Sequence, residues 1–455
     1  MQDSPYISDS SLYANPALVV TVSALLLLLA FVYLVRRKPA RMLAIFCVAH
    51  VLVFVHNEAL FISSELVLPF LAIEILRGSK RREGDALVSR YHRYVFVFVT
   101  ALVFTGLLAV ASAKFSYGMP EWVAAMKFLV WMILPIAFVA RVDFGSVDEE
   151  TRLVLYLLPI VSAITAVQLI LSALSVLFGG VSFLDVLAQR TIGGYISTPA
   201  GASNTLAAFM ALGVVAAMGL MAMDSRHRLL LKGLVGLCLA GILLTTSRGV
   251  LVSLLCVWLW HIKIWKRLSW KYAVIALLFS AIFVPVIANS MGDSDNPFVA
   301  RLTSRDIATG DVKGYGEDIS SGRFTLWGIA ALNIAANPYT GVGFHNASAL
   351  ELAGASTAHN IFLNMMEDSG LLGFIPFFLL FLFLIRLRRR VVRALAESRS
   401  VAFDTLTALL LLALLNMQIE SPEANAQYMF FVALVMSLFV MLGSHLLSSA
   451  EAQRS

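Results

Sequence analysis

Long runs of hydrophobic residues, joined by short polar connections, dominate the sequence. Most runs are about 20 residues long, the length at which a helix crosses a bilayer. They are continuously apolar rather than alternating, which favours helices over the strands of a membrane barrel. The runs lie near 16–35, 41–56, 59–76, 94–113, 121–140, 153–178, 203–223, 230–246, 249–262, 272–290, 365–385, 403–419 and 428–447. This pattern predicts an all-α, polytopic integral membrane protein with about 12–13 transmembrane helices, the second and third runs forming either two spans or a re-entrant pair around His56-Asn57-Glu58.

The composition agrees with the hydrophobic pattern. Of the 455 residues, 59% are hydrophobic and 14% are charged, whereas a soluble domain carries about 25% charged residues. A single apolar core also stops growing at roughly 250–300 residues. A water-soluble globular protein is therefore excluded.

The distribution of Lys and Arg predicts the orientation in the membrane. All but eight of the 34 basic residues lie in loops on one side of the predicted spans, and such loops are cytoplasmic in membrane proteins. The net charge of +6 is thus mostly a topology signal and does not imply nucleic acid. The opposite, external side holds only Lys114, Lys127, Arg190, Arg248, Arg301, Arg305, Lys313 and Arg323.

Loop lengths divide the chain into three regions. Residues 1–290 form about ten spans with an external loop at 179–202, residues 291–360 form a large external loop, and residues 361–455 form the C-terminal spans. A connection as long as 291–360 is usually functional or disordered. Its stretch SGRFTLWGIAALNIAANP predicts a helix with Ser321 as N-cap, ended by Pro338, with Phe324, Trp327, Ala331 and Ile334 on one face. Such a helix either carries function or is a structural lid.

The external arginines are the first candidate binding residues. Arg248 lies in a turn of a few residues within LLTTSRGVLV, and Arg190 and Arg323 lie on the same side. A guanidinium offers a phosphate a bidentate fork and a permanent charge. The structural alternative is a snorkelling anchor or a local ion pair.

His359 is the candidate catalytic residue. It directly precedes the apolar run after the large loop, and its ordinary pKa range suits a general base near neutral pH. Its neighbour Asn360 could orient a ligand or cap the helix. A metal is only weakly indicated, because Asp293-Ser294-Asp295 has the spacing of a divalent-cation motif but such short matches are common by chance.

Three stretches in this order resemble the O-antigen ligase and polymerase superfamily. They are the TTSRG turn, SGRFTLWGIAALNIAANPYTGVGF and AHNIFLNMMEDSGLLG. The O-antigen ligase is the closer likeness, mainly through the His359-Asn360 pair that opens the helix after the large loop. The resemblance covers roughly 185–375, and the flanking spans match only as generic hydrophobic helices.

The resemblance implies a GT-C-like membrane glycosyltransferase at the periplasmic face of the bacterial inner membrane. It implies transfer of O-antigen from undecaprenyl diphosphate to a sugar hydroxyl of lipid A-core, without nucleotide, metal or other cofactor. The family's essential histidine corresponds to His359, and its diphosphate-binding arginines correspond to Arg190, Arg248 and Arg323, with Asn360, Arg301 and Arg305 as further supporting candidates.

Two alternatives remain at this point. An O-antigen polymerase uses the same donor and is poorly separated from a ligase by sequence. A transporter of lipid-linked saccharides would favour ionisable residues deep in several spans and repeated halves. The few candidates for such residues are Glu65, Glu74 and Asp404, and the sequence has no internal repeat.

Overall fold

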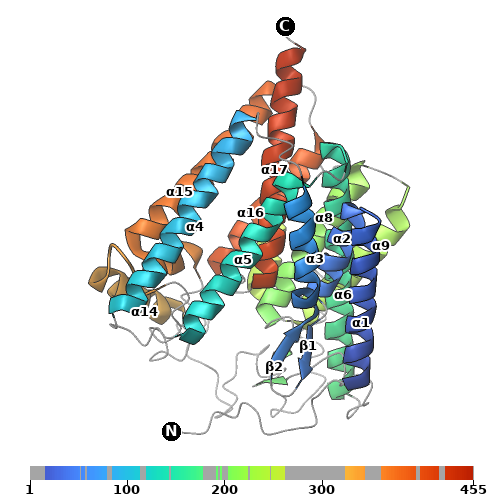
Figure 1. The fold of residues 1–455 in the computed structure, drawn as a ribbon, viewed down its shortest axis with the longest axis horizontal. Coiled ribbons are helices and arrows are strands. Elements are labelled where there is room, and N and C mark those ends of the chain that lie inside the picture. The colour runs from blue at the N-terminus through green and yellow to red at the C-terminus, as the bar shows by residue number, and fades with distance from the viewer. Residues whose placement is uncertain are drawn as a thin grey trace. The chain divides into compact units, whose positions relative to one another are not determined.

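The computed structural model describes a predominantly helical chain (Figure 1). The described residues are 16–51, 53–56, 59–78, 85–112, 119–142, 145–177, 191–192, 195–196, 203–223, 226–245, 247–261, 323–343, 360–395, 400–419 and 426–453, some of them by backbone only. Thirteen helices lie within these ranges. The predicted all-α membrane fold class is confirmed.

Most of the predicted spans coincide with helices where the chain is described, except at residues 53–62. Six helices are long and apolar enough to cross a membrane, and five shorter apolar helices accompany them among the described residues. The predicted span at 272–290 lies outside the described residues. The agreement is close because a continuous apolar run of this length is itself a strong helix signal in lipid.

The chain divides into two compact units, and the first begins with a small helical group. Helices α1, α2 and α3 pack against one another, and strands β1 and β2 form an antiparallel hairpin between α2 and α3. The register pairs Val53 with Ile62 and His56 with Ala59. The bounds are α1 Pro16–Val35, α2 Pro39–Val51, β1 Val53–His56, β2 Ala59–Ile62 and α3 Ser63–Arg77.

This hairpin corrects the sequence prediction for the second and third spans. The run at 41–56 is helical only to Val51, and the run at 59–76 becomes helical only from Ser63. Five of the eight residues of VFVH and ALFI are Val, Ile or Phe, which favour extended backbone. Hydrophobicity alone did not distinguish these strands from helix.

The rest of the first unit surrounds α8, whose residues are nearly all buried. Helix α8 packs against α9 and α10, and the hydroxyl of Ser162 on α6 donates a hydrogen bond to the carbonyl of Phe209 on α8 at 3.0 Å. A two-residue hairpin, β3 with β4, lies before α8. The bounds are α6 Val147–Leu177, β3 Thr191–Ile192, β4 Tyr195–Ile196, α8 Ser203–Met223, α9 Arg228–Leu244 and α10 Arg248–His261.

The second unit is organised around α17. Helices α4, α5, α15 and α16 all pack against it, and α14 packs against α15. Phe403 and Phe439 stack with ring centroids 4.7 Å apart, and Tyr91 shares a buried hydrogen bond with Ser437 at 3.3 Å. The bounds are α4 Ala86–Ser112, α5 Met119–Arg141, α14 Arg323–Ala336, α15 Ile361–Ala394, α16 Val401–Ile419 and α17 Ala426–Ala452.

Candidate active site

Four of the predicted site residues lie outside the described residues: His359, Arg190, Arg301 and Arg305. Arg248 and Arg323 are described by their backbone only, and Asn360 is described in full. Arg248 belongs to the first unit, whereas Arg323 and Asn360 belong to the second.

Arg248 is the first residue of α10 and follows a tight, buried turn. Thr245 ends α9, and its hydroxyl donates to the carbonyl of Ile242 at 2.6 Å. The hydroxyl oxygen of Thr245 also accepts a 3.4 Å bond from the backbone N–H of Ser247, and both residues are buried. Thr245 thus provides a hydrogen-bond partner for the backbone where the chain leaves α9 for α10.

Arg323 is likewise the first residue of a helix, the predicted helix of the large loop. The structure confirms this helix as α14, Arg323–Ala336. Its buried residues are Leu326 and Ala330, whereas Trp327 and Ile334 of the predicted apolar face are half-buried and Ala331 is exposed. The helix is apolar on several sides, so periodicity alone did not determine which side packs against α15.

Asn360 caps α15. Its backbone is extended, and its side-chain carbonyl accepts hydrogen bonds from the backbone N–H groups of Phe362 at 3.1 Å and Leu363 at 3.2 Å. The sequence left open whether Asn360 orients a ligand or caps the helix, and its side-chain carbonyl oxygen caps the helix. Since His359 directly precedes this cap, the cap fixes the point at which the chain leaves His359.

Helix α15 contains a sharp break at Gly370. The backbone there has φ 57° and ψ −160°, a combination accessible essentially only to glycine. The ring of Phe362 lies 6.0–6.3 Å from those of Phe374, Phe377 and Phe381, so the segment before the break turns back along the segment after it. The predicted span at 365–385 is therefore not one straight helix.

A turn at 338–343 pairs with the backbone groups that this break leaves free. The N–H groups of Val342 and Gly343 donate to the carbonyls of Glu367 at 2.8 Å and Asp368 at 2.9 Å. In the opposite direction, the N–H groups of Leu371 and Leu372 donate to the carbonyls of Pro338 at 2.9 Å and Tyr339 at 3.1 Å. We call residues 338–343 with 367–372 the α14–α15 clasp. Non-helical backbone within a membrane protein needs such compensation.

Two glycines permit this close approach. Gly341 has φ 67°, and a Cβ atom there would collide with the backbone of Asp368. A Cβ atom on Gly370 would collide with the backbone of Tyr339. The glycines of the PYTGVG and EDSG stretches therefore have a packing role as well as a conformational one.

A buried carboxyl group completes the clasp. Glu367 is 2% exposed, and its Oε1 accepts a 2.7 Å hydrogen bond from the side-chain amide of Asn333 on α14. Sequence reasoning missed this pair. The available signal was an acid and an amide inside otherwise apolar segments, which in a membrane protein indicates a polar contact or a functional site.

The described residues contain no group of three or more His, Cys, Asp or Glu side chains placed to hold a metal ion. Asp293 and Asp295, the weak metal motif, lie outside the described residues. Among the described residues, the first unit contains Arg248 at the start of α10, and the second unit contains Arg323 at the start of α14, the capped α15 and the clasp.

The fold and these features define the class: a polytopic, helical membrane protein with a helix-start arginine in each unit and a broken helix held by main-chain contacts. Residues 233–378 match the family model for O-antigen ligase, about a third of the 455-residue chain. This match includes α10, α14 and the clasp, and it supports an assignment of this segment to the O-antigen ligase family. A search of curated proteins found no match. The family implies glycosyltransferase-like activity in O-antigen biosynthesis.

Proposed function

We propose that the protein is an O-antigen ligase that transfers O-antigen polysaccharide from undecaprenyl diphosphate to a sugar hydroxyl of lipid A-core. The observation that carries this proposal is the family match over the segment with Arg248, Arg323 and His359. The active site faces the periplasm, and the segment 291–360 supplies its reactive residues. The basic loops support this orientation.

The donor diphosphate is bound by arginines at helix starts. Arg248 and Arg323 both occupy the first position of a helix, where unpaired backbone N–H groups and the helix dipole also attract an anion. Arg190 adds a third guanidinium, with Arg301 and Arg305 as supporting residues. Because charge grows on the diphosphate as its bond to the sugar lengthens, fixed cations stabilise the transition state more than the ground state.

His359 is the general base. It accepts the proton of the acceptor hydroxyl as that oxygen attacks the anomeric carbon from the face opposite the diphosphate. The sugar–diphosphate bond breaks as the new glycosidic bond forms, so one displacement inverts the anomeric centre. The cap at Asn360 and the clasp support this role because they hold the start of α15 beside His359.

The test uses purified protein with undecaprenyl-diphosphate-linked glycan and lipid A-core, with chelator present and no nucleotide. We expect a ligated lipopolysaccharide product that needs no added cofactor. Transfer of the glycan to a second lipid-diphosphate chain instead would favour the polymerase. Movement of the lipid-linked glycan across vesicles without any transfer would favour the transporter.

In the same assay, His359→Ala should lower kcat by roughly 10²–10⁴-fold, the usual contribution of a general base. The matched control is His345→Ala, a second histidine of the large loop, which should keep near-normal turnover. Near-normal ligation by a correctly inserted His359→Ala variant would contradict the base assignment.

A further inference from the structure

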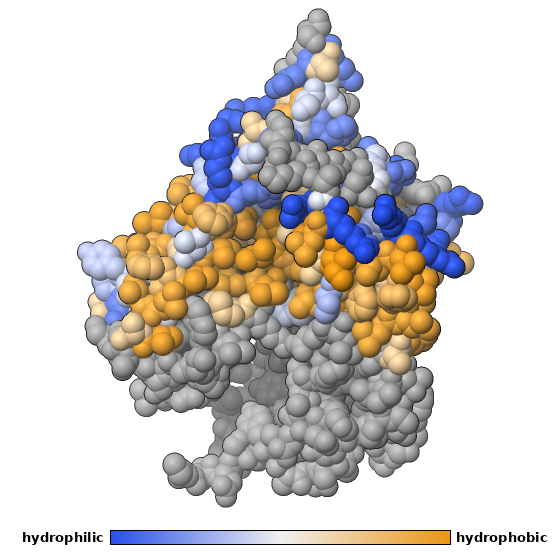
Figure 2. All heavy atoms as spheres, in the orientation of Figure 1, coloured by the Kyte–Doolittle hydropathy of each residue, from blue (hydrophilic) through white to orange (hydrophobic). Residues whose placement is uncertain are grey.

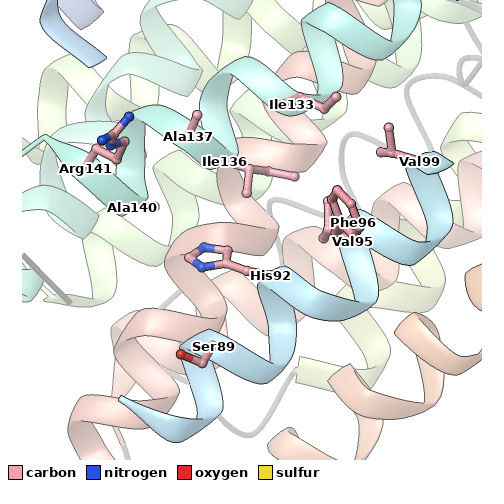
Figure 3. Close-up of a pocket in the computed structure, with 10 residues that line it drawn as sticks. All are labelled: Ser89, His92, Val95, Phe96, Val99, Ile133, Ile136, Ala137, Ala140 and Arg141. Atoms are coloured by element: carbon pink, nitrogen blue, oxygen red, sulfur yellow. The ribbon is translucent and has the colours of Figure 1, made fainter. Parts of the chain in front are cut away.

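A lateral groove of about 420 Å³ lies between α4 and α5 in the second unit (Figure 3). All ten residues that line it come from these two helices. Both helices pack against α17, and α4 also packs against α15. On the α5 side the groove is lined by Ala137 and Ala140, whose small side chains leave space between the helices. None of these residues belongs to the candidate active site.

The groove is lined by apolar side chains along most of its length, and it is open along one side. Val95, Phe96 and Val99 of α4 line one wall, and Ile133 and Ile136 of α5 line the other. Phe96 is 71% exposed, whereas Val95 is buried. In a helix that spans a membrane, such an exposed apolar side chain faces lipid. Figure 2 shows hydrophobic residues across the described apolar helices, with hydrophilic residues gathered toward one end.

One end of the groove is polar. Ser89 and His92 lie on the first turns of α4, and Arg141 is the last residue of α5. Figure 3 shows the imidazole of His92 projecting from α4 between the two helices and the Arg141 side chain at the end of α5. No Asp or Glu is among the lining residues. This end is on the side of the basic loops.

The dimensions match one leaflet of a bilayer. Arg141 lies eight positions after Ile133, which corresponds to a rise of about 12 Å along the helix. One leaflet contributes roughly 15 Å of the approximately 30 Å hydrocarbon core. The groove therefore begins at headgroup depth and ends before the bilayer midplane.

We propose that this groove is a binding site for an anionic phospholipid of the leaflet that borders the basic loops. One acyl chain lies along the apolar walls between Phe96 and Ile133. The headgroup phosphate accepts hydrogen bonds from the Arg141 guanidinium and the Ser89 hydroxyl, with His92 at the boundary between headgroup and chain. Basic pockets between membrane helices bind anionic headgroups in this way.

The charge of the site selects the occupant. A guanidinium with no acidic neighbour in the groove favours a headgroup of net negative charge over a zwitterionic one, in which an ammonium group accompanies the phosphate. The undecaprenyl donor also carries phosphate, but in the proposed reaction it is used at the opposite face. The lipid site is thus independent of the proposed transferase activity.

The experiment uses full-length protein in nanodiscs of phosphatidylcholine that contain a few per cent of a photoactivatable probe lipid. The probe is phosphatidylglycerol with a diazirine in one acyl chain, and crosslinked peptides are mapped by mass spectrometry. We expect crosslinks on 95–99 and 133–137. Ala137→Trp, which fills the groove, should abolish them, and Arg141→Ala should reduce them about fivefold or more.

Two matched controls should leave the labelling unchanged. Val130→Trp adds the same bulk at an exposed position of α5 outside the groove, and Arg152→Ala removes an exposed arginine of the same membrane side from α6. Elution of each variant from a sizing column as one symmetric peak checks its folding. If Ala137→Trp does not fold, the proposal is tested by Arg141→Ala alone, which changes only the end of α5.

Three outcomes would overturn the proposal. Labelling that persists in well-folded Ala137→Trp would show that the lipid is not in the groove. Equal labelling by a phosphatidylcholine probe would show that headgroup charge is not recognised. Displacement of the phosphatidylglycerol probe by an equal concentration of undecaprenyl phosphate would identify the isoprenoid carrier as the occupant.

Discussion

Arg248 occupies a position in its helix that suits the binding of an anion. It directly follows the buried Ser247 and begins α10. An arginine at a helix N-terminus gains nothing from the helix dipole, which favours negative charge there. An anion bound at that end would benefit from both the dipole and the guanidinium.

Replacing Arg248 by Ala should therefore lower kcat/KM for the undecaprenyl-diphosphate donor by about a hundredfold or more, as for the loss of one transition-state donor. Arg305→Ala, in the same external set, should lower it only a few-fold. Steady-state transfer with purified variants measures both. Equal losses would mean that the diphosphate is bound elsewhere.

Asn360 caps its helix through its side-chain carbonyl. Asn360→Ala should destabilise the start of α15 by about 1 kcal/mol and reduce transfer several-fold by loosening His359. Asn360→Asp retains a capping oxygen and should restore both thermal stability and transfer. Loss of transfer in Asn360→Asp at normal stability would instead indicate that the amide N–H₂ contacts substrate.

The α14–α15 clasp is the element that gives the described half of the candidate site its shape. It joins a turn after α14 to the break in α15 through reciprocal main-chain hydrogen bonds, and it buries Glu367 against Asn333. Breaking a buried hydrogen bond of this kind costs about 1–3 kcal/mol. The clasp thus ties the turn after α14 to the break in α15.

Gly370→Ala should disrupt this element. The substitution forces an L-residue into a glycine-only conformation, at a cost of about 1–3 kcal/mol, and places Cβ against the backbone of Tyr339. We expect a lower apparent Tm in detergent and loss of transfer. The control is Gly328→Ala on α14, where a Cβ atom meets nothing within 4 Å.

Helix propensity predicts that Gly328→Ala leaves Tm unchanged or slightly raised. A Gly370→Ala variant with wild-type Tm and wild-type transfer would show that the break in α15 is not required. Comparing Gly370→Ala with Gly328→Ala separates the effect of replacing any glycine from the effect of losing the left-handed backbone conformation at Gly370.

At the scale of the whole molecule, the asymmetry of Lys and Arg predicts the orientation. A single cysteine at Ser225, in a basic loop, should react with a membrane-impermeant maleimide only after the membrane is opened. A single cysteine at Ser294, in the large loop, should react in intact spheroplasts. Both tests need Cys47, Cys238 and Cys256 replaced first, and the reverse pattern would contradict a periplasmic active site.

Some features follow from sequence because they depend on neighbours in the chain. The bounds of α1 and α8 equal those of the predicted spans at 16–35 and 203–223, because uninterrupted hydrophobicity over about 20 residues is enough to specify a helix in lipid. The turn before Arg248 and the helix that begins at Arg323 also follow from neighbouring residues in the chain. The match to the O-antigen ligase family model at 233–378 covers this turn and this helix, and it does not cover α1 or α8.

Other features were decided only by contacts between residues far apart in the sequence. The hairpin at 53–62, the buried face of α14, the fold-back of α15 at Gly370 and the pairing of Asn333 with Glu367 each depend on which segments lie together. Periodicity shows that a helix has apolar residues but not which partner covers them. The sequence alone therefore determined the spans, their helical character and the candidate residues, whereas the tertiary structure decided how the backbone around the candidate site is bent and held, because that depends on long-range hydrogen bonds and packing.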